Sequence, residues 1–480
     1  MAKSIKRNLL YNIILNVTNI LFPIITAPYV ARVLEPDGIG LFHFSYTVAG
    51  YFALAACLGI PTYGIRIIGA NRENFSKRQL VFNQVFTIAC ASTLLFTIGY
   101  LLSLLFVPKF NENYLLFLIS GLALYIVPFK VDWYFSGMEE FGYIAVRSTI
   151  IKILSIVLLF ILVKEKGDLV YYVSISAFSI AANEIWNFAK LIKTGIKPRL
   201  VASGLSTHIK PIFVLFSSFI ATAIYTSLGS VLLGFISDYS EVGYYNIASQ
   251  IGRVAIPIVT SLALVALPKI SEYMARNDEK SVNELINKSM SFVAFLSFPL
   301  SMIICLMSPL FIPLFFGPGY EAAIIPMRIL AFVVVAIGLN NLTGIQILIG
   351  LGKDRYFFYS TAISSLVSIV LYAIFVYLLG AIGAAIVTLL AEMLILLLSL
   401  YFILYKTFVV FTKQSDFYKS FFSSLILIPI YMLLSNLLSG WLCIILFGVI
   451  GMLAYLLIQI LLKNSNIGII HNMINNIKNR

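Results

Sequence analysis

Long apolar stretches recur along the whole chain, and they constrain its fold more than any other feature. A helix needs roughly 20 apolar residues to cross the hydrocarbon core of a bilayer. The 480 residues are 60% hydrophobic and 11% charged, whereas soluble domains are about 25% charged. We therefore predict an all-α polytopic membrane protein. By the length rule it has about fourteen spans, at residues 8–31, 39–60, 80–106, 113–135, 143–163, 170–190, 212–236, 243–268, 290–316, 327–350, 358–379, 383–405, 420–438 and 441–462.

Positive charges are distributed unevenly between the predicted loops. Most of the 33 lysines and arginines, Arg147 among them, lie near the chain ends or in every second loop, whereas the opposite loops hold Arg32, Lys109, Lys164 and Lys166. Cytoplasmic loops of membrane proteins carry such an excess. We predict that both termini are cytoplasmic and that the net charge of +13 reflects topology rather than a nucleic-acid partner. The first apolar segment is too long for the core of a cleavable signal peptide.

No pattern for catalysis or metal binding is evident in the sequence. The three histidines are scattered, and Cys57, Cys90, Cys305 and Cys443 lack the spacing of metal ligands. The predicted external loops are too short to hold the catalytic groups of a membrane polymerase or ligase. We therefore predict a protein that is not an enzyme and has no metal or cofactor.

Two short motifs recur in the same order in the two parts of the chain. "IGLFHFS" (39–45) matches "VGYYNIA" (242–248) at an offset of about 203 residues, and "GMEEFGY" (137–143) shares Gly and Tyr with "GLGKDRY" (350–356) at about 213. We predict a duplication. Residues 1–195 and 196–412 would form two six-helix bundles, and residues 413–480 would add two helices and a cytoplasmic tail. Paired halves of transporters place a substrate site between them near the bilayer midplane.

Several segments resemble one family of transporters. They are "FPIITAPYVARVL" followed by "PDGIGLFHFS", then "LGIPTYGIR", "DWYFSGMEEFGYIA", "LGFISDYSEVGYYNIASQI" and "FFGPGYEAAIIPMRIL". In this order they are similar to the O-antigen and polysaccharide repeat-unit flippases (the Wzx family) of the multidrug/oligosaccharidyl-lipid/polysaccharide exporter superfamily. The resemblance covers nearly the whole chain.

The resemblance implies a function. A member of this family moves undecaprenyl-pyrophosphate-linked oligosaccharide repeat units, of O-antigen or capsule, from the cytoplasmic to the periplasmic leaflet of the bacterial inner membrane. It works by alternating access, with two six-helix bundles around a central cavity. The implied partners are the lipid-linked oligosaccharide and membrane lipids, with the polymerase and chain-length regulator of the same pathway as further candidates.

Two other transporter functions stay open. A cation-coupled multidrug or small-molecule exporter of the same superfamily would need more acidic than basic residues in its cavity, because its substrates are cations. A peptidoglycan-precursor flippase is a closer variant. The sequence favours a polysaccharide flippase because the charges expected near the cavity are mostly basic.

Arg253 lies inside an otherwise apolar span. An arginine at the centre of a membrane helix costs about 2.5–3.5 kcal/mol on insertion scales. A guanidinium that faces a cavity would offer forked donors to the oxygens of a pyrophosphate. The alternative is a structural ion pair with Glu392, which lies near mid-depth in the span 383–405.

Other cations are weaker candidates for substrate contact. Lys130 and Asp132 lie at the cytoplasmic end of a predicted span, where they would contact substrate or pair with each other. Arg66 is either a cytoplasmic anchor or part of the entry for the pyrophosphate. Arg32 and Arg328 mark the periplasmic mouth and could assist release.

Glu184 and Glu392 are carboxylates within predicted spans. A proton-coupled cycle would need such groups, because protonation makes their movement through hydrocarbon less costly. Structural pairing is the alternative for both. The sequence does not distinguish coupling to H⁺ or Na⁺ from an effect of membrane potential on an anionic substrate.

Overall fold

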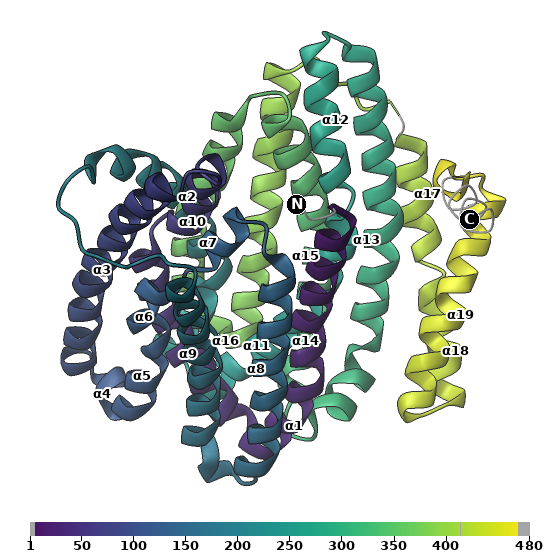
Figure 1. Cartoon of the computed structure of the whole chain (residues 1–480). Helices are drawn as coiled ribbons and strands as arrows, with labels where there is room; N and C mark the ends of the chain where they lie inside the picture. The colour runs from purple at the N-terminus through teal and green to yellow at the C-terminus, as the bar shows by residue number, and fades with distance from the viewer. Residues whose placement is uncertain (1–4, 413, 469–480) are drawn as a thin grey trace. The chain divides into compact units, whose positions relative to one another are not determined.

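The computed structural model describes residues 5–412 and 414–468, with side chains except those of residues 5–17, 19–21, 217–219, 221–226 and 264–265. The described residues lie in helices and short connections, and none of them forms a β-strand (Figure 1). The all-α prediction is therefore confirmed. The outermost residues of both termini, which the charge pattern places in the cytoplasm, lie outside the described ranges.

The chain divides into two compact units, Met1–Gly243 and Tyr244–Arg480. The first contains α1 (Ile5–Cys57), α2 (Ile60–Ala70), α3 (Phe75–Phe106), α4 (Pro108–Glu112), α5 (Tyr114–Ser120), α6 (Leu122–Tyr125), η1 (Val127–Phe129), α7 (Asp132–Gly137), α8 (Phe141–Leu162), η2 (Lys166–Asp168), α9 (Leu169–Lys193) and α10 (Ser206–Ile236). Helix α11 (Tyr239–Thr260) continues into the second unit. That unit contains α12 (Ala263–Ala275), α13 (Glu279–Phe316), η3 (Glu321–Ala323), α14 (Ile324–Ala331), α15 (Val333–Asn340), η4 (Asn341–Ile349), α16 (Asp354–Lys406), α17 (Gln414–Ser424), α18 (Leu427–Leu437) and α19 (Gly440–Leu461).

Some predicted spans are broken helices. Residues 113–135 form α5, α6, η1 and α7 instead of one helix. Gly121 lies between α5 and α6, and Pro128 lies in η1. Proline cannot donate the hydrogen bond that would continue a helix, and broken helices at membrane depth are tolerated where protein surrounds them. The span 327–350 similarly ends in η4, which is a π-helix.

Two pairs of predicted spans are joined into long kinked helices. The kink in α1 is at Glu35 (φ 59°), directly before Pro36, and the kink in α16 is at Gly380 (φ 55°). The Glu35 carboxylate lies 2.6 Å from Lys166 Nζ in the turn between α8 and α9. This hydrogen bond and the carboxylate charge raise the pKa of Lys166. The bend of α1 is thereby linked to the α8–α9 turn.

Gly40 and Gly243 are the matched glycines of the first repeat motif, and they bring α1 and α11 into close contact. A Cβ atom on Gly40 would overlap the carbonyl oxygen of Tyr239, and a Cβ atom on Gly243 would overlap that of Pro36. Small residues allow membrane helices to approach each other closely. The repeat motif therefore marks a backbone contact that a side chain would block.

An extended segment after α9, which we term the first strap (residues 196–203), lies along α3. The backbone N–H of Lys197 donates to Gln79 Oε1 (2.8 Å), and that of Arg199 donates to Asn83 Oδ1 (3.1 Å). Gln79 and Asn83 are four residues apart, so they lie on one face of the helix. Polar side chains on α3 therefore supply partners for a backbone that belongs to no helix.

The second unit repeats this arrangement after α16. In the second strap (residues 408–412), the N–H of Val410 donates to Asn283 Oδ1 (2.8 Å) and that of Thr412 donates to Asn287 Oδ1 (2.7 Å). Asn283 and Asn287 lie on α13, again four residues apart. The buried Asn287 also donates to the carbonyl oxygen of Val410 (2.9 Å).

The matched positions support the predicted duplication. The strap residues Lys197 and Val410 are about 213 residues apart, the offset of the second repeat motif. Helices α9 and α16 end at Lys193 and Lys406, which have the same offset. The division into residues 1–195, 196–412 and 413–480 stays a prediction.

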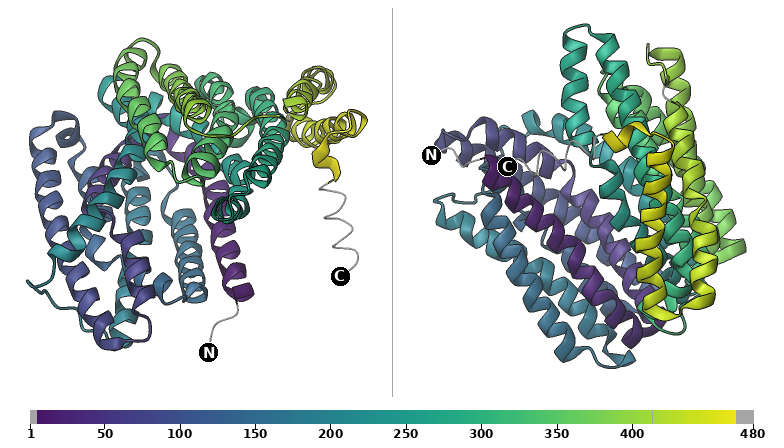
Figure 2. Two further views of the ribbon diagram at one scale, coloured as in Figure 1. Left: turned by 90° about the horizontal axis from the view of Figure 1, so that it is seen from above. Right: turned by 90° about the vertical axis from the view of Figure 1, so that its right-hand side faces the viewer.

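The C-terminal helices pack against α13 within the second unit. Helices α18 and α19 run side by side in opposite directions (Figure 1, Figure 2). Tyr455 Oη on α19 donates to the carbonyl oxygen of Phe295 (2.9 Å), and Asn466 Nδ2 donates to Ser291 Oγ (2.6 Å). These bonds fix the added helices to the unit that precedes them.

The Gly40 contact gives a stability prediction. Gly40→Ala should lower the free energy of unfolding by about 1–3 kcal/mol, because the new methyl group forces α1 away from α11. Gly50→Ala is the matched control, because nothing lies within 4 Å of its added Cβ, and alanine favours the helix by about 0.5–1 kcal/mol. Thermal unfolding of the purified variants measures both. A Gly40→Ala protein as stable as Gly50→Ala would contradict the predicted close contact.

Candidate functional site

A polar cluster in the first unit joins α7, α8 and α9. Its members are Asp132, Arg147, Asn183, Glu184 and Asn187. Asp132 Oδ1 accepts hydrogen bonds from Arg147 Nη2 (3.0 Å) and from Asn187 Nδ2 (2.8 Å). The side chain of Arg147 is 3% exposed, whereas that of Asp132 is 44% exposed. The ion pair therefore has one buried end and one accessible end.

Further contacts orient the guanidinium of Arg147. Its Nε donates to Asn183 Oδ1 (3.2 Å), and its Cζ lies 5.5 Å from the centre of the Tyr143 ring. The planar guanidinium suits both a forked hydrogen bond and an aromatic face. Arg147 is thereby fixed between α7 and α9.

Glu184 is buried on the face of α9 that carries Asn187, three residues further on. It interacts electrostatically with Asp132, Lys130 and Arg147. In the part of the chain that the structure describes, Glu184 Oε2, Asn187 Oδ1 and Arg147 Nη1 have no hydrogen-bond partner. Buried polar atoms without partners are rare and need an explanation.

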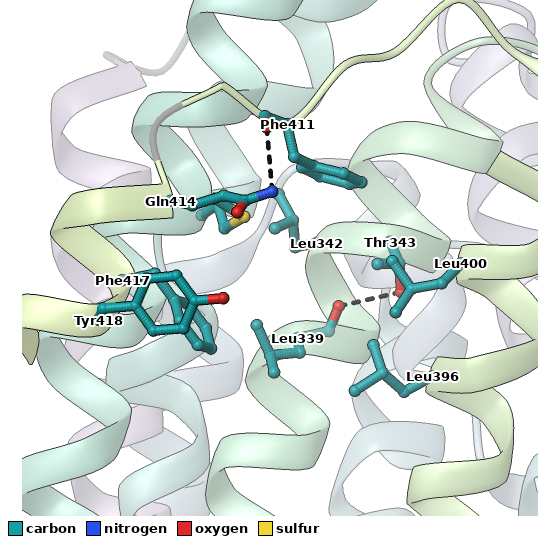
Figure 3. Close-up of a pocket in the computed structure, with 10 residues that line it drawn as sticks. Leu339, Leu342, Thr343, Leu396, Leu400, Phe411, Gln414, Phe417 and Tyr418 are labelled. Atoms are coloured by element: carbon teal, nitrogen blue, oxygen red, sulfur yellow. Dashed lines mark hydrogen bonds between the residues drawn. The ribbon is translucent and has the colours of Figure 1, made fainter. Parts of the chain in front are cut away.

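An apolar pocket of about 320 Å³ lies within the second unit (Figure 3). Two of its polar side chains are turned to the backbone: Thr343 Oγ1 donates to the carbonyl oxygen of Leu339 (3.0 Å), and Gln414 Nε2 donates to that of Phe411 (3.4 Å). The hydroxyl of Tyr418 points toward the middle of the pocket (Figure 3). The pocket therefore offers a mainly hydrocarbon surface. Its lining comes from α13, α15, η4, α16, the second strap and α17, and comprises Met290, Leu339, Leu342, Thr343, Leu396, Leu400, Phe411, Gln414, Phe417 and Tyr418.

Two residues that line the pocket lie at the repeat offset from two residues of the polar cluster. Leu396 and Leu400 follow Asn183 and Asn187 by about 213 residues, the offset of the helix ends and the straps. The first repeat thus has the amides Asn183 and Asn187 at the positions where the second has Leu396 and Leu400. If the predicted duplication holds, one half carries a polar cluster where the other carries part of an apolar pocket.

Glu392 is buried on α16, and its carboxylate does not pair with a cation in the described structure. Asn340 Nδ2 donates to Glu392 Oε2 (2.7 Å) and to the carbonyl oxygen of the same residue (2.9 Å). One turn earlier, Thr388 Oγ1 lies 2.9 Å from both Tyr245 Oη and Tyr372 Oη. These groups form a second buried polar region beside η4, which starts directly after Asn340.

The structure does not pair Arg253 with Glu392, although the sequence analysis gave this ion pair as an alternative. Arg253 is exposed on α11, and among the described residues it forms no ion pair with Glu392. Arg66, Arg32 and Arg328 are also exposed, on α2, α1 and α14. Because these guanidiniums are accessible, substrate contact by them stays a prediction.

The suggested pair between Lys130 and Asp132 is replaced by a different one. Asp132 pairs with Arg147, which the charge pattern had assigned only to cytoplasmic anchoring. Lys130 is half-buried and lines a small space of about 20 Å³ with Cys57 and Trp133. The closer partner for Asp132 is on α8 because α7 packs against that helix.

Sequence reasoning missed Asn183, Asn187, Arg147 and Asn340. The stretch "NEIWN" (183–187) did carry a signal, because its two amides and one carboxylate fall on one face of an apolar helix. Asn340 gave no comparable signal. A single amide in a membrane helix is compatible with many partners.

The chain resembles known proteins in sequence. Residues 5–274 match the family described as "Polysaccharide biosynthesis protein". A protein of Escherichia coli (strain K12) named "Putative O-antigen transporter" is 26% identical over 414 residues, which are 83% of this chain and 97% of that protein. A protein of Shigella dysenteriae with the same name is 24% identical over 411 residues, 82% of this chain and 99% of that protein.

The fold also resembles solved structures. "Lipid II flippase MurJ, inward closed conformation" has a TM-score of 0.78 at 18% identity, covering 96% of this chain and 100% of that chain. An inward-facing multidrug resistance MATE family transporter of the MOP superfamily has a TM-score of 0.58 at 15% identity. The match covers 80% of this chain and 94% of that chain. At these identities the likeness establishes a shared fold.

The ion pair of the polar cluster should contribute to stability. Arg147→Ala should lower the free energy of unfolding by about 1–3 kcal/mol, because Asp132 and Asn183 lose a charged partner. Arg72→Ala is the control. Arg72 pairs with Glu139, and their side chains are 39% and 45% exposed, respectively; exposed ion pairs contribute about 0–1 kcal/mol. Chemical unfolding in detergent compares the two variants, and equal losses would show that the buried position of Arg147 has no special role.

Proposed function

The chain belongs to the family of polysaccharide biosynthesis proteins within the MOP transporter superfamily, and we propose that it moves a lipid-linked oligosaccharide across the bacterial inner membrane. In this proposal the lipid is undecaprenyl pyrophosphate and the oligosaccharide is a repeat unit of O-antigen or capsule. The direction is from the cytoplasmic to the periplasmic leaflet. Transport proceeds by alternating access, and both termini of the chain are cytoplasmic.

The observation that supports this proposal is that the chain holds both an apolar pocket, in the second unit, and a polar cluster, in the first. A lipid-linked oligosaccharide is amphiphilic, with a long hydrocarbon chain and a charged, hydroxylated headgroup. Pockets for small ligands have volumes of about 300–1,000 Å³. The pocket beside Leu396 and Leu400, at about 320 Å³, can therefore hold a stretch of hydrocarbon but no complete substrate.

The headgroup needs cations. An uncompensated pyrophosphate in hydrocarbon would be very costly, and arginine matches phosphate oxygens with forked donors. We assign this contact to Arg253 first, because it lies within a membrane helix and its side chain is exposed. The further candidate contacts are Lys130, Arg66, Arg32 and Arg328.

The names of the relatives favour this substrate class. Both sequence relatives are named as O-antigen transporters, and the family name refers to polysaccharide biosynthesis. A cationic drug would not need an accessible arginine inside a membrane helix. The pathway's polymerase and chain-length regulator are the partners that would receive the transported unit.

A pocket-filling variant tests the proposal in cells. We expect a bacterium that lacks this protein to accumulate the lipid-linked repeat unit in the cytoplasmic leaflet, and the wild-type protein to restore its transfer. Leu400→Trp should reduce the transfer rate about tenfold or more, which corresponds to at least 1.4 kcal/mol, because the indole occupies the pocket. Leaflet sidedness of the labelled intermediate is the measurement.

Leu397→Trp is the matched control, because Leu397 lies on the same helix and is 64% exposed. It should restore transfer as well as the wild type does at equal protein level. If the intermediate does not accumulate in cells without the protein, the flippase proposal is wrong. If Leu400→Trp restores full transfer, the pocket does not hold the substrate.

A further inference from the structure

The three atoms of the polar cluster that lack a partner among the described residues differ in their hydrogen-bonding role. Arg147 Nη1 is a hydrogen-bond donor, and Asn187 Oδ1 is an acceptor. Glu184 Oε2 can be either, because a protonated carboxyl group donates and an ionised one only accepts. The hydrogen-bonding role of Glu184 therefore depends on one proton.

With the proton present, Glu184 has a partner on its own helix. Asn187 is three residues further along α9, on the same face, and its Oδ1 is free to accept. Asn187 Nδ2 is already used by Asp132. A neutral Glu184 thus fits the cluster with Arg147 bound to Asp132.

Without the proton, Glu184 needs a donor, and the described cluster contains one. Arg147 Nη1 has no partner although the side chain is 3% exposed. An ionised carboxylate attracts a guanidinium strongly in a site with little water. Arg147 would then share or transfer its hydrogen bonds from Asp132 to Glu184.

The charges around Glu184 favour two discrete states. Asp132 on α7 repels an ionised Glu184, whereas Lys130 after η1 and Arg147 on α8 attract it. The Cys57 thiol on α1 also interacts with Glu184, and Tyr143 on α8 interacts with Arg147 and Asp132. With Glu184 neutral, Lys130 and Arg147 outnumber Asp132 by one charge. With Glu184 ionised, two cations face two carboxylates.

We propose that Glu184 is a proton-binding site and that Arg147 exchanges between Asp132 and Glu184 when this proton binds or leaves. On release the proton passes to water and the carboxylate takes the free guanidinium N–H. Asp132, whose side chain is already 44% exposed, is then available to another partner. As a coupling mechanism for transport this inference rests on the proposed function, but the proton site itself does not.

At the repeat offset, the described residues that match Glu184 and Arg147 carry no charge. The position about 213 residues after Glu184 is Leu397, and that after Arg147 is Ser360. Glu392 lies elsewhere on α16, and its carboxylate already accepts from Asn340. Glu392 is therefore a separate buried carboxyl group of the second unit, held by an amide instead of an arginine.

Infrared spectroscopy of the purified protein tests the site without substrate. A buried protonated carboxyl group gives a C=O stretching band that disappears when it ionises. We expect a band that titrates with pH in the wild type and is missing in Glu184→Gln, whereas a band from the buried Glu392 should remain in that variant. Glu73→Gln removes an exposed carboxyl group and should leave the band unchanged.

Arg147→Gln tests the exchange of partners. The midpoint of the Glu184 band should move to higher pH by about one unit or more, because the ionised carboxylate loses its cation. An unchanged midpoint would show that Arg147 does not stabilise the ionised form of Glu184. If no band in the wild-type spectrum both titrates with pH and disappears in Glu184→Gln, the proposed proton site is wrong.

Transport measurements separate this inference from the proposed function. In liposomes with a pH gradient, Glu184→Gln should lose the dependence of transport rate on the gradient. A titrating band without transport of lipid-linked oligosaccharide would contradict the proposed function and leave the proton site intact. Transport in Glu184→Gln with undiminished dependence on the gradient would overturn the coupling role.

Discussion

Hydrocarbon offers no partner to a backbone amide or to a charged side chain, and this constraint organises the structure. Where the chain leaves a helix, side chains take over the missing bonds, as Gln79 and Asn283 do for the two straps. Where a charge is buried, as in Arg147, it donates hydrogen bonds to acceptors on two other helices. The few buried polar atoms that lack partners are therefore the places where function is to be sought.

The membrane spans could be predicted because burial in lipid leaves a direct record in composition. Nearly every apolar stretch became a helix, and the repeat offsets reappear in the straps and helix ends. The breaks around Gly121 and Pro128 were missed because an apolar stretch looks the same whether it is one helix or several. The kinked continuity of α16 through Gly380 has the same cause.

The candidate site was less accessible to prediction from sequence. Glu184 was identified as a carboxylate within a span and Asp132 as a possible partner of Lys130. The actual partner of Asp132, Arg147, was hidden among the many cations that the charge pattern assigns to the cytoplasm. Similar depth in the membrane suggested an ion pair between Arg253 and Glu392. In the structure, the Glu392 carboxylate accepts a hydrogen bond from Asn340 instead. Depth in the membrane follows from position in the chain, whereas the partner of a charge depends on which helices pack together.

The most direct test of a lipid-linked oligosaccharide transporter is reconstitution of the purified protein. A fluorescent lipid-linked oligosaccharide is placed in the outer leaflet of liposomes, and a quencher that does not cross the bilayer is added at successive times. The account predicts that fluorescence becomes protected as the substrate moves inward, at a rate that rises with the amount of protein. Equal rates with and without protein would contradict it.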